Sequence, residues 1–150
     1  MSVWDASKPF TGSSSNDGSA VEVGVKFRVA SAGTISGVKF YKISGNSGTH
    51  TGSLWSASGQ RLATGTFANE TASGWQQLLF AAPVAVTANT TYVASYHAPA
   101  GNYARSTGFF ASALTAGEIT LMSDGQAGGN GVYRYGASGF PSGSYNASNY

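Results

Sequence analysis

The stretch Gly74–Pro99, GWQQLLFAAPVAVTANTTYVASYHAP, decides the fold of this chain. It contains two runs rich in aromatic and aliphatic residues, Trp75–Phe80 and Tyr92–Tyr96, with a turn at Thr87–Asn89 between them. Side chains alternate between the two faces of a strand, so the second run places both of its tyrosines on one face and its serine on the other. The stretch therefore predicts half of a two-layer β-sheet core.

Strand patterns extend on both sides of this stretch. Val21–Val29 alternates four valines and a phenylalanine with polar residues and glycine, which predicts a strand with one face in solvent. Thr34–Ile43 predicts a second strand, which we expect to pair antiparallel with the first. Thr51–Ser56 and Arg61–Phe67 predict a hairpin across a glycine-containing turn.

These patterns predict an all-β fold without helices. Short strands are also expected at 119–122 and 132–135, and no segment has helical periodicity. Eight or more short strands separated by turn residues are typical of an antiparallel β-sandwich of jelly-roll or immunoglobulin-like type. We predict one domain over residues 1–150, in which residues 1–19 form an N-terminal strand and loop.

The composition excludes several function classes. Charged residues make up only 9% of the chain, against about 25% in an average soluble protein. The net charge is +2 and the basic residues are scattered, which argues against nucleic acid as a partner. There are no cysteines, so disulfides and cysteine-ligated zinc are excluded. No apolar run is long enough to insert into a membrane.

Catalytic signatures are missing from the six Asp and Glu residues. A glycosidase needs two carboxylates placed across the scissile bond, and no pattern pairs them here. A serine triad usually sits on a strand–turn–helix elbow, and no such elbow is present. We therefore expect no enzyme activity, with a weak glycoside hydrolase or lyase as the less favoured alternative.

Calcium is the one metal that the sequence brings into consideration, and no other cofactor is indicated. Asp17 and Glu22 place two carboxylates at the start of one strand, and calcium takes six to eight oxygen ligands, many of which loop carbonyls supply. The competing interpretation is an Asx-turn at Asp17 and an ordinary surface charge at Glu22.

Aromatic residues next to amide, imidazole and guanidinium groups are the most informative functional feature. Flat sugar faces pack against tyrosine and tryptophan rings, and sugar hydroxyls bind polar side chains. The competing interpretation is that the same residues pack the core or stabilise turns. The predicted ligand-binding residues are His50, Trp55, His97, Asn102, Tyr103, Tyr133, Arg134 and Tyr135.

The chain also resembles a known family. The resemblance rests on the segments VEVGVKF, GNSGTHTGSLWSASGQRLATGTF, ETASGWQQLLFAAPVAVTANTTYVASYHAP, GGNGVYRYG and FPSGSYNASNY. These are similar to the domain-of-unknown-function family numbered 4082, from about Ala20 to Tyr150. The resemblance implies a β-sandwich accessory module of large secreted or surface-attached bacterial proteins, tethered to catalytic or adhesive domains. It also implies a further apolar strand after Tyr150, so one sheet edge or core slot of residues 1–150 is expected to lie open.

Together these observations predict a non-catalytic carbohydrate-binding module. Rings and polar side chains in loops would be presented to a polysaccharide or glycan. The alternative is a structural or adhesive spacer that binds protein or nothing. The two differ in whether the predicted ligand-binding residues converge on one surface or scatter.

Overall fold

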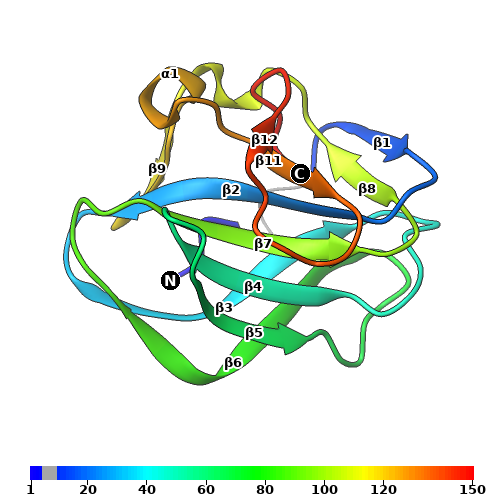
Figure 1. Cartoon of the computed structure of the whole chain (residues 1–150), viewed down its shortest axis with the longest axis horizontal. Helices are drawn as coiled ribbons and strands as arrows, with labels where there is room; N and C mark the ends of the chain where they lie inside the picture. The colour runs from blue at the N-terminus through cyan, green and yellow to red at the C-terminus, as the bar shows by residue number, and fades with distance from the viewer. Residues whose placement is uncertain (5–9) are drawn as a thin grey trace.

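The computed structural model describes residues 1–4 and 10–150, and it is a β-sandwich (Figure 1). Residues 5–9 of the predicted N-terminal strand and loop lie outside the described residues. The strands are β1 (Ser13–Asn16), β2 (Val21–Val29), β3 (Gly33–Lys42), β4 (Thr51–Ser56), β5 (Arg61–Thr66), β6 (Gly74–Val86), β7 (Tyr92–Ala98), β8 (Asn102–Arg105), β9 (Leu114–Ala116), β10 (Ile119–Leu121), β11 (Val132–Tyr135) and β12 (Gly143–Ser144). Two single helical turns, η1 (Phe109–Ala111) and α1 (Asp124–Ala127), connect them.

One large antiparallel sheet forms the first layer. Its strands follow the order β12-β11-β2-β7-β4-β5, and β10, with β9 beside it, pairs with the far end of β2. β11 and β10 therefore share one edge of β2, with β11 opposite residues 21–24 and β10 opposite residues 27–29. The β4–β5 hairpin that the sequence predicted is present.

The second layer consists of two separate pairs, β3–β6 and β1–β8. The predicted pairing of residues 21–29 with 34–43 is therefore wrong. β2 pairs with β7, β10 and β11, whereas β3 crosses to the other layer and pairs with β6. This crossing lets the apolar faces of both strands meet in the core rather than lie side by side in one sheet.

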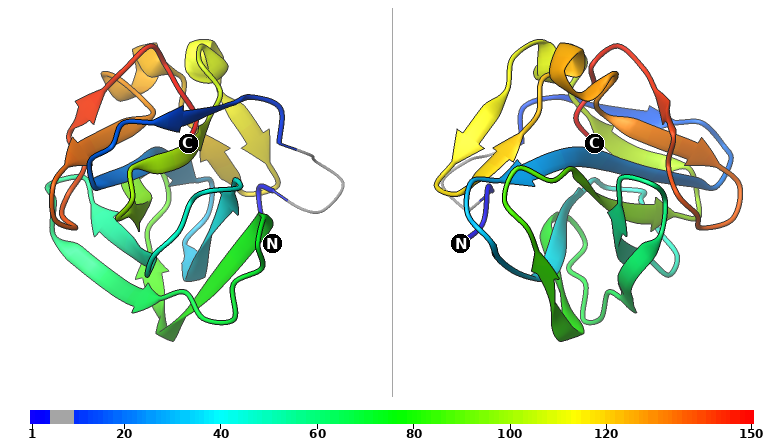
Figure 2. Two further views of the ribbon diagram at one scale, coloured as in Figure 1. Left: turned by 90° about the vertical axis from the view of Figure 1, so that its right-hand side faces the viewer. Right: turned by 60° about the vertical axis from the view of Figure 1, so that its left-hand side comes forward.

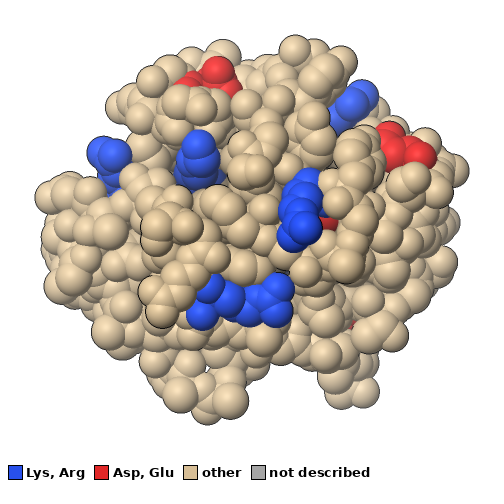
Figure 3. All heavy atoms as spheres, viewed as in Figure 1, with Lys and Arg blue, Asp and Glu red and all other residues tan. Residues whose placement is uncertain are grey.

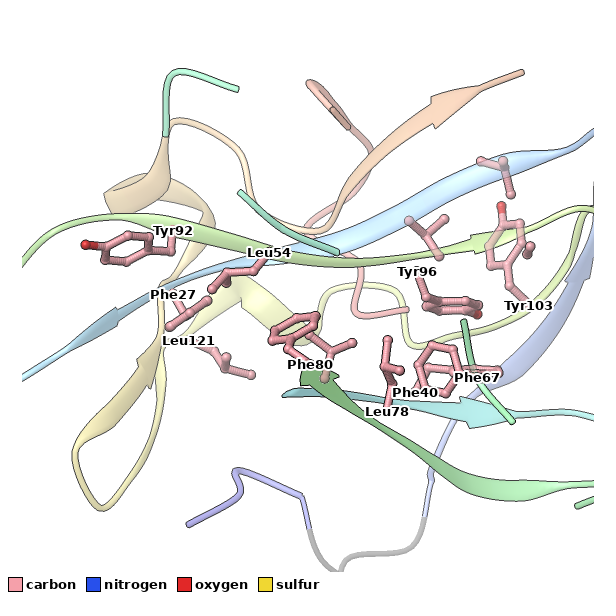
Figure 4. Close-up of a cluster of buried hydrophobic side chains, with 14 of the residues drawn as sticks. Phe27, Phe40, Leu54, Phe67, Leu78, Phe80, Tyr92, Tyr96, Tyr103 and Leu121 are labelled. Atoms are coloured by element: carbon pink, nitrogen blue, oxygen red, sulfur yellow. The ribbon is translucent and has the colours of Figure 1, made fainter. Parts of the chain in front are cut away.

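The core lies between the two layers and is rich in aromatic rings (Figure 4). Phe40 of β3 is its centre, because its ring stacks on Tyr96 of β7 at 4.2 Å between centroids and meets Phe67 edge-on at 4.8 Å. Tyr92 and Tyr96 are both buried, as the alternation of the second run predicted. Aromatic contacts across the two layers thus hold β3 against β7.

The outer face of the large sheet is also covered in part. Trp55, Val93 and Val132 form a small buried cluster there, and the ring of Phe140 packs on it. The segment 136–142, which follows β11, crosses this face in front of β2 and β7 (Figure 2). The outer face of the large sheet is therefore buried around Trp55, Val93 and Val132. The solvent-facing side predicted for residues 21–29 is wrong at Glu22, which is completely buried.

Residues 1–4 and 10–150 contain no helix long and apolar enough to cross a membrane.

Candidate functional site

The best-formed group of predicted residues is a cluster around Asp17. The hydroxyl groups of Tyr103 and Tyr135 both donate to Oδ2 of Asp17, each at 2.6 Å. Tyr133 meets Tyr135 edge-on at 5.6 Å, and Tyr150 meets Tyr103 in the same way at 5.6 Å. We call Asp17 and these four tyrosines the tyrosine–Asp17 cluster.

Four separate segments build this cluster. Asp17 follows β1, and its backbone N–H donates to the carbonyl of Gly101, which places it at the start of β8. Tyr133 and Tyr135 lie on the inner face of β11, because β11 pairs them with Val23 and Val21 of β2. The β1–β8 pair and the C-terminal residues thus meet the end of the large sheet, as the crowding of β1, β8, β11 and the C-terminus in Figure 1 shows.

The Asp17 carboxylate holds the two tyrosine hydroxyls in their protonated form. It raises the pKa of Tyr135 to about 12, chiefly through its hydrogen bond to that hydroxyl. The pKa of Tyr103 is also raised, first by burial and then by the hydrogen bond and the charge of Asp17. Both hydroxyls therefore stay donors across the physiological pH range, and the two rings are fixed against one carboxylate.

The cluster presents part of itself to solvent. The residue Tyr135 is 50% exposed and Asp17 is exposed, while Tyr103 beneath them is buried. Among the described residues no donor is hydrogen-bonded to the second carboxylate oxygen of Asp17. Nearby, Arg105 lies two residues after Tyr103 on β8, and its guanidinium lies 6.0 Å from the exposed ring of Tyr145.

Glu22, the other predicted metal ligand, lies elsewhere in a buried polar chain on the outer face of the large sheet. The Trp55 indole N–H donates to the hydroxyl of Ser95 at 2.8 Å, and that hydroxyl donates to Oε1 of Glu22 at 2.6 Å. The other oxygen of Glu22 lies 3.5 Å from Nδ1 of His97. Trp55 is buried in this arrangement and presents no ring to solvent.

Arg134 lies next to this series of buried hydrogen bonds and is itself exposed to solvent. It sits directly opposite Glu22 in the β11–β2 register, and Glu22 in turn sits opposite His97 of β7. Lys and Arg side chains are visible on this side of the molecule at separate positions rather than in one continuous patch (Figure 3). The residues that face outward here thus form a polar strip whose carboxylate is covered, not a concave aromatic surface.

His50 lies apart from both groups and is completely buried in the main core. Its Nδ1 lies 2.9 Å from both carboxylate oxygens of Glu70, which also accepts from Lys42 at 2.7 Å. Burial lowers the pKa of His50, so the ring is neutral and donates to Glu70. Nε2 of His50 lies 2.8 Å from the Oδ1 position of the Asn46 amide. Because a neutral ring that donates at Nδ1 can only accept at Nε2, we assign the NH2 group of this amide to that position instead.

The structure thus separates the predicted residues into three groups. Tyr103, Tyr133 and Tyr135 come together, and Asp17 joins them as the acceptor for two hydroxyls. Asn102, the neighbour of Tyr103, donates to the carbonyl of Gly45 at 2.8 Å instead. The outer-face group holds Trp55, His97 and Arg134, and the core holds His50.

No part of the chain that the structure describes gathers three or more His, Cys, Asp or Glu residues into a metal-binding group. Asp17 and Glu22 engage different partners, two tyrosines and a serine, so they do not form the common site that their spacing predicted. Their proximity in sequence was misleading because the turn between β1 and β2 directs Asp17 toward β8 while Glu22 is already inside the sheet.

Sequence reasoning missed several deeply buried polar residues. Asn46, Ser95 and Asn130 are at most 4% exposed, and each is hydrogen-bonded to a residue named above or to the β2 main chain. Little in the sequence singled these residues out, since a lone Asn or Ser is common in loops and on strands. Ser95 alone gave a hint, because it alternates with apolar residues in a strand predicted to be buried.

A scan against protein-family models matches residues 6–150 to one family, described as Domain of unknown function (DUF4082). No curated protein matches the chain. The match spans nearly the whole chain, including every strand of the sandwich and every member of the tyrosine–Asp17 cluster. The chain therefore belongs to the DUF4082 family of domains of unknown function.

Proposed function

We propose that this domain is a non-catalytic carbohydrate-binding module and that the tyrosine–Asp17 cluster is its binding site. The observation that carries the proposal is the double hydrogen bond at Asp17, which uses one carboxylate oxygen to fix two tyrosine hydroxyls. This arrangement supports a half-exposed ring, Tyr135, at a fixed distance from an exposed carboxylate.

The Tyr135 ring and the Asp17 carboxylate match the two kinds of surface on a sugar, its apolar C–H face and its hydroxyl groups. The C–H groups of a pyranose face pack against an aromatic ring, and its hydroxyl groups donate to a carboxylate. Because both elements are held before binding, little conformational entropy is lost when a sugar docks. Arg105 and Tyr145 lie beside the cluster and extend the same chemistry along the surface.

The burial of one carboxylate and the pairing of another support the view that the domain is not a catalyst. Glu22 is completely buried, and Glu70 is paired with Lys42 and His50. A glycosidase needs an acid and a second carboxylate that both reach the glycosidic bond. Asp17, whose one oxygen already serves two tyrosines, is better suited to holding a ligand than to proton transfer.

The proposal places the module in a secreted or surface-attached bacterial protein. A single ring and carboxylate would bind with micromolar to millimolar affinity, about 4–8 kcal/mol. Tethering to a catalytic or adhesive domain would turn this modest affinity into useful avidity on a polymer. Within this proposal, a calcium ion could bind at the second carboxylate oxygen of Asp17, since carboxylate and carbonyl oxygens are its preferred ligands.

The test is retention of the purified domain on insoluble polysaccharides and its retardation in gels that contain soluble ones. Tyr135→Ala should lose retention, because it removes the exposed ring from a position that the core does not need. Tyr135→Phe should retain part of it, since the ring stays but its hydrogen bond to Asp17 is lost. Tyr41→Ala, a tyrosine of β3 outside the cluster, is the matched control and should bind as the unmodified domain does.

Each remaining outcome is informative. Retention that disappears in EDTA but survives in Tyr135→Ala would assign the binding to a cation rather than to the ring. An absence of retention on every polymer, with all variants folded by circular dichroism, would reject the proposal in favour of a structural spacer.

A further inference from the structure

Asn130 and Gly131 form a dipeptide that is chemically labile in an unconstrained chain. In such a pair the main-chain nitrogen of the glycine attacks the side-chain amide carbon of the asparagine, because glycine has no side chain to hinder the approach. Asn130 is the only asparagine of this sequence that is followed by glycine. It is therefore the expected position of spontaneous deamidation when the chain is unfolded.

The fold nevertheless depends on both residues of this pair. Asn130 is completely buried, and its side chain accepts from the Lys26 N–H at 2.8 Å and donates to the carbonyl groups of Lys26 and Met122 at 3.0 and 2.7 Å. Gly131 has a φ of +71°, and a Cβ atom on it would overlap the carbonyl oxygen of Ser148. The structure thus needs an amide at position 130 and no side chain at position 131.

The same contacts hold the pair in an unreactive arrangement. The N–H of Gly131 donates to Oδ1 of Asn130 at 2.7 Å, so the nitrogen presents its proton to the oxygen rather than its electron pair to Cγ. Attack requires that this proton be lost to solvent and that the amide rotate, yet both residues are buried. Rotation would also break the hydrogen bonds to Lys26 and Met122.

We propose that Asn130 is a deamidation site that the folded domain protects and that unfolding exposes, and that the modified chain no longer regains the fold. In the unfolded chain a bond forms between the Gly131 nitrogen and Cγ of Asn130 while the bond from Cγ to Nδ2 breaks. The side-chain nitrogen leaves as ammonia and carries away the proton that the Gly131 nitrogen loses. Water then opens the succinimide ring at either of its two carbonyl groups, which gives aspartate or isoaspartate at position 130.

Neither product can take the place of Asn130. A carboxylate has no proton to donate, so it would face the carbonyl groups of Lys26 and Met122 without a hydrogen bond and in a buried position. Isoaspartate also lengthens the main chain by one carbon atom directly before Gly131, which lies against Ser148. Deamidation therefore makes an unfolding event irreversible. This site is separate from the tyrosine–Asp17 cluster and does not depend on its proposed function.

The first test compares the unmodified domain in mildly alkaline buffer with the same domain in guanidinium chloride. Mass spectrometry of proteolytic peptides measures the conversion of residue 130. We expect conversion to be at least tenfold faster in guanidinium chloride. Asn102, which is followed by the bulky Tyr103, is the internal control and should stay unmodified in both samples. Equal rates in the two samples, or faster conversion in the folded domain, would overturn the proposal.

The second test measures refolding after increasing times in guanidinium chloride. The fraction that regains native tryptophan fluorescence on dilution should fall in step with the conversion of residue 130. Incubation in mildly acidic guanidinium chloride is the control, because the Gly131 nitrogen then keeps its proton, and this sample should refold throughout. Converted chains that refold as well as unconverted ones would overturn the claim that the fold is lost.

Two core variants test whether protection comes from the folded state as a whole. Phe40→Ala removes a ring that packs on Tyr96 but leaves the contacts of Asn130 in place, and it should accelerate conversion in native buffer at least tenfold. Leu79→Ala, at an exposed position, should leave the rate unchanged. An unchanged rate in a folded but destabilised Phe40→Ala domain would show that the reaction does not pass through unfolding and would overturn the proposal. If Phe40→Ala fails to fold, the comparison of the unmodified domain with and without denaturant decides the matter.

Discussion

At the scale of single residues, shared polar groups join segments that are separate in the sequence. Asp17 accepts from two tyrosines with one oxygen, and His50 is held between Glu70 and the Asn46 amide. The hydrogen bond to Asp17 raises the pKa of Tyr135, and burial together with Asp17 raises the pKa of Tyr103. Burial lowers the pKa of His50. These states give two predictions that titration can check.

The first concerns the ionisation of Tyr135. Its pKa is raised to about 12 because ionisation would place a phenolate against the Asp17 carboxylate. Asp17→Asn should lower this pKa toward the usual value of about 10, since the variant removes the negative charge. The ultraviolet absorbance of ionised tyrosine, followed against pH with Tyr135→Phe as the reference, measures the shift.

The same coupling has a consequence for alkaline stability. A tyrosine whose pKa is higher in the folded than in the unfolded state stabilises the fold below about pH 10, and this contribution is lost as the pH rises through the folded value. Asp17→Asn should therefore show a smaller loss of stability between pH 10 and about pH 12 than the unmodified domain. An identical loss in both proteins would contradict the assignment.

The second prediction concerns His50 in acid. Burial lowers its pKa in the folded state, so the unfolded chain takes up a proton first as the pH falls below about 6.5. The free energy of unfolding should therefore decrease from pH 7.5 to pH 5. Urea unfolding followed by tryptophan fluorescence measures this slope.

Substitution of His50 isolates the cause. His50→Gln should flatten the pH dependence, because residue 50 then has no group to titrate in this range, although the variant should be less stable at every pH. A slope that is as steep in His50→Gln as in the unmodified domain would contradict the assignment.

At the scale of elements, β2 shows how one strand edge is completed by side chains. β11 and β10 pair with the two ends of this edge and leave Lys26 between them. The side chain of Asn130, which is completely buried, fills the gap: its Oδ1 accepts from the Lys26 N–H at 2.8 Å, and its Nδ2 donates to the Lys26 carbonyl at 3.0 Å. One amide side chain thus replaces a missing residue of the ladder.

The third prediction follows from this bridge. Asn130→Ala should destabilise the domain by about 3 kcal/mol, because it removes the side chain that accepts from the Lys26 N–H and donates to the Met122 carbonyl. Asn102→Ala, which removes a single exposed hydrogen bond to Gly45, should cost less than about 1 kcal/mol. The two values come from urea unfolding at pH 7.5, and equal costs would show that water replaces Asn130 readily.

At the scale of the whole molecule, the two layers are joined chiefly by aromatic rings. Phe40 on β3 is 1% exposed and contacts Tyr96 of the large sheet and Phe67, which directly follows β5. In the part of the chain that the structure describes, no other strand is hydrogen-bonded to the β3 edge of the pair β3–β6, so these contacts carry much of the attachment between the layers.

The fourth prediction is that Phe40→Ala destabilises the domain by about 3–5 kcal/mol, since it opens a cavity where the layers meet. Leu79→Ala, on the neighbouring strand but 64% exposed, should change stability by less than about 0.5 kcal/mol. Thermal unfolding of the two variants side by side checks the difference. A small effect of Phe40→Ala would mean that the β3–β6 pair is held mainly by its connections along the chain.

Local patterns were sufficient to place most strands. The alternation at residues 21–29 corresponds to β2 in full, and the apolar and turn residues at 51–67 predicted the β4–β5 hairpin. β6 is longer than predicted and runs through Pro83, which is tolerated because residues 80–83 lie where the register between β3 and β6 shifts and have no partner in the ladder. A short strand, β1, lies within residues 1–19, for which the sequence predicted a strand and a loop. The sequence did not place it at residues 13–16, because its main chain pairs with β8 while most of its side chains stay exposed.

The sequence by itself determined the all-β class, the strand positions and the choice of tyrosines as functional candidates, because side-chain alternation and turn chemistry are local properties. Only the tertiary structure decided which strands pair, why Glu22 and His50 are buried, and how residues 17, 103 and 135 meet at one carboxylate. Those outcomes depend on contacts between separate segments of the chain, and on the packing of two layers that a single strand pattern does not specify.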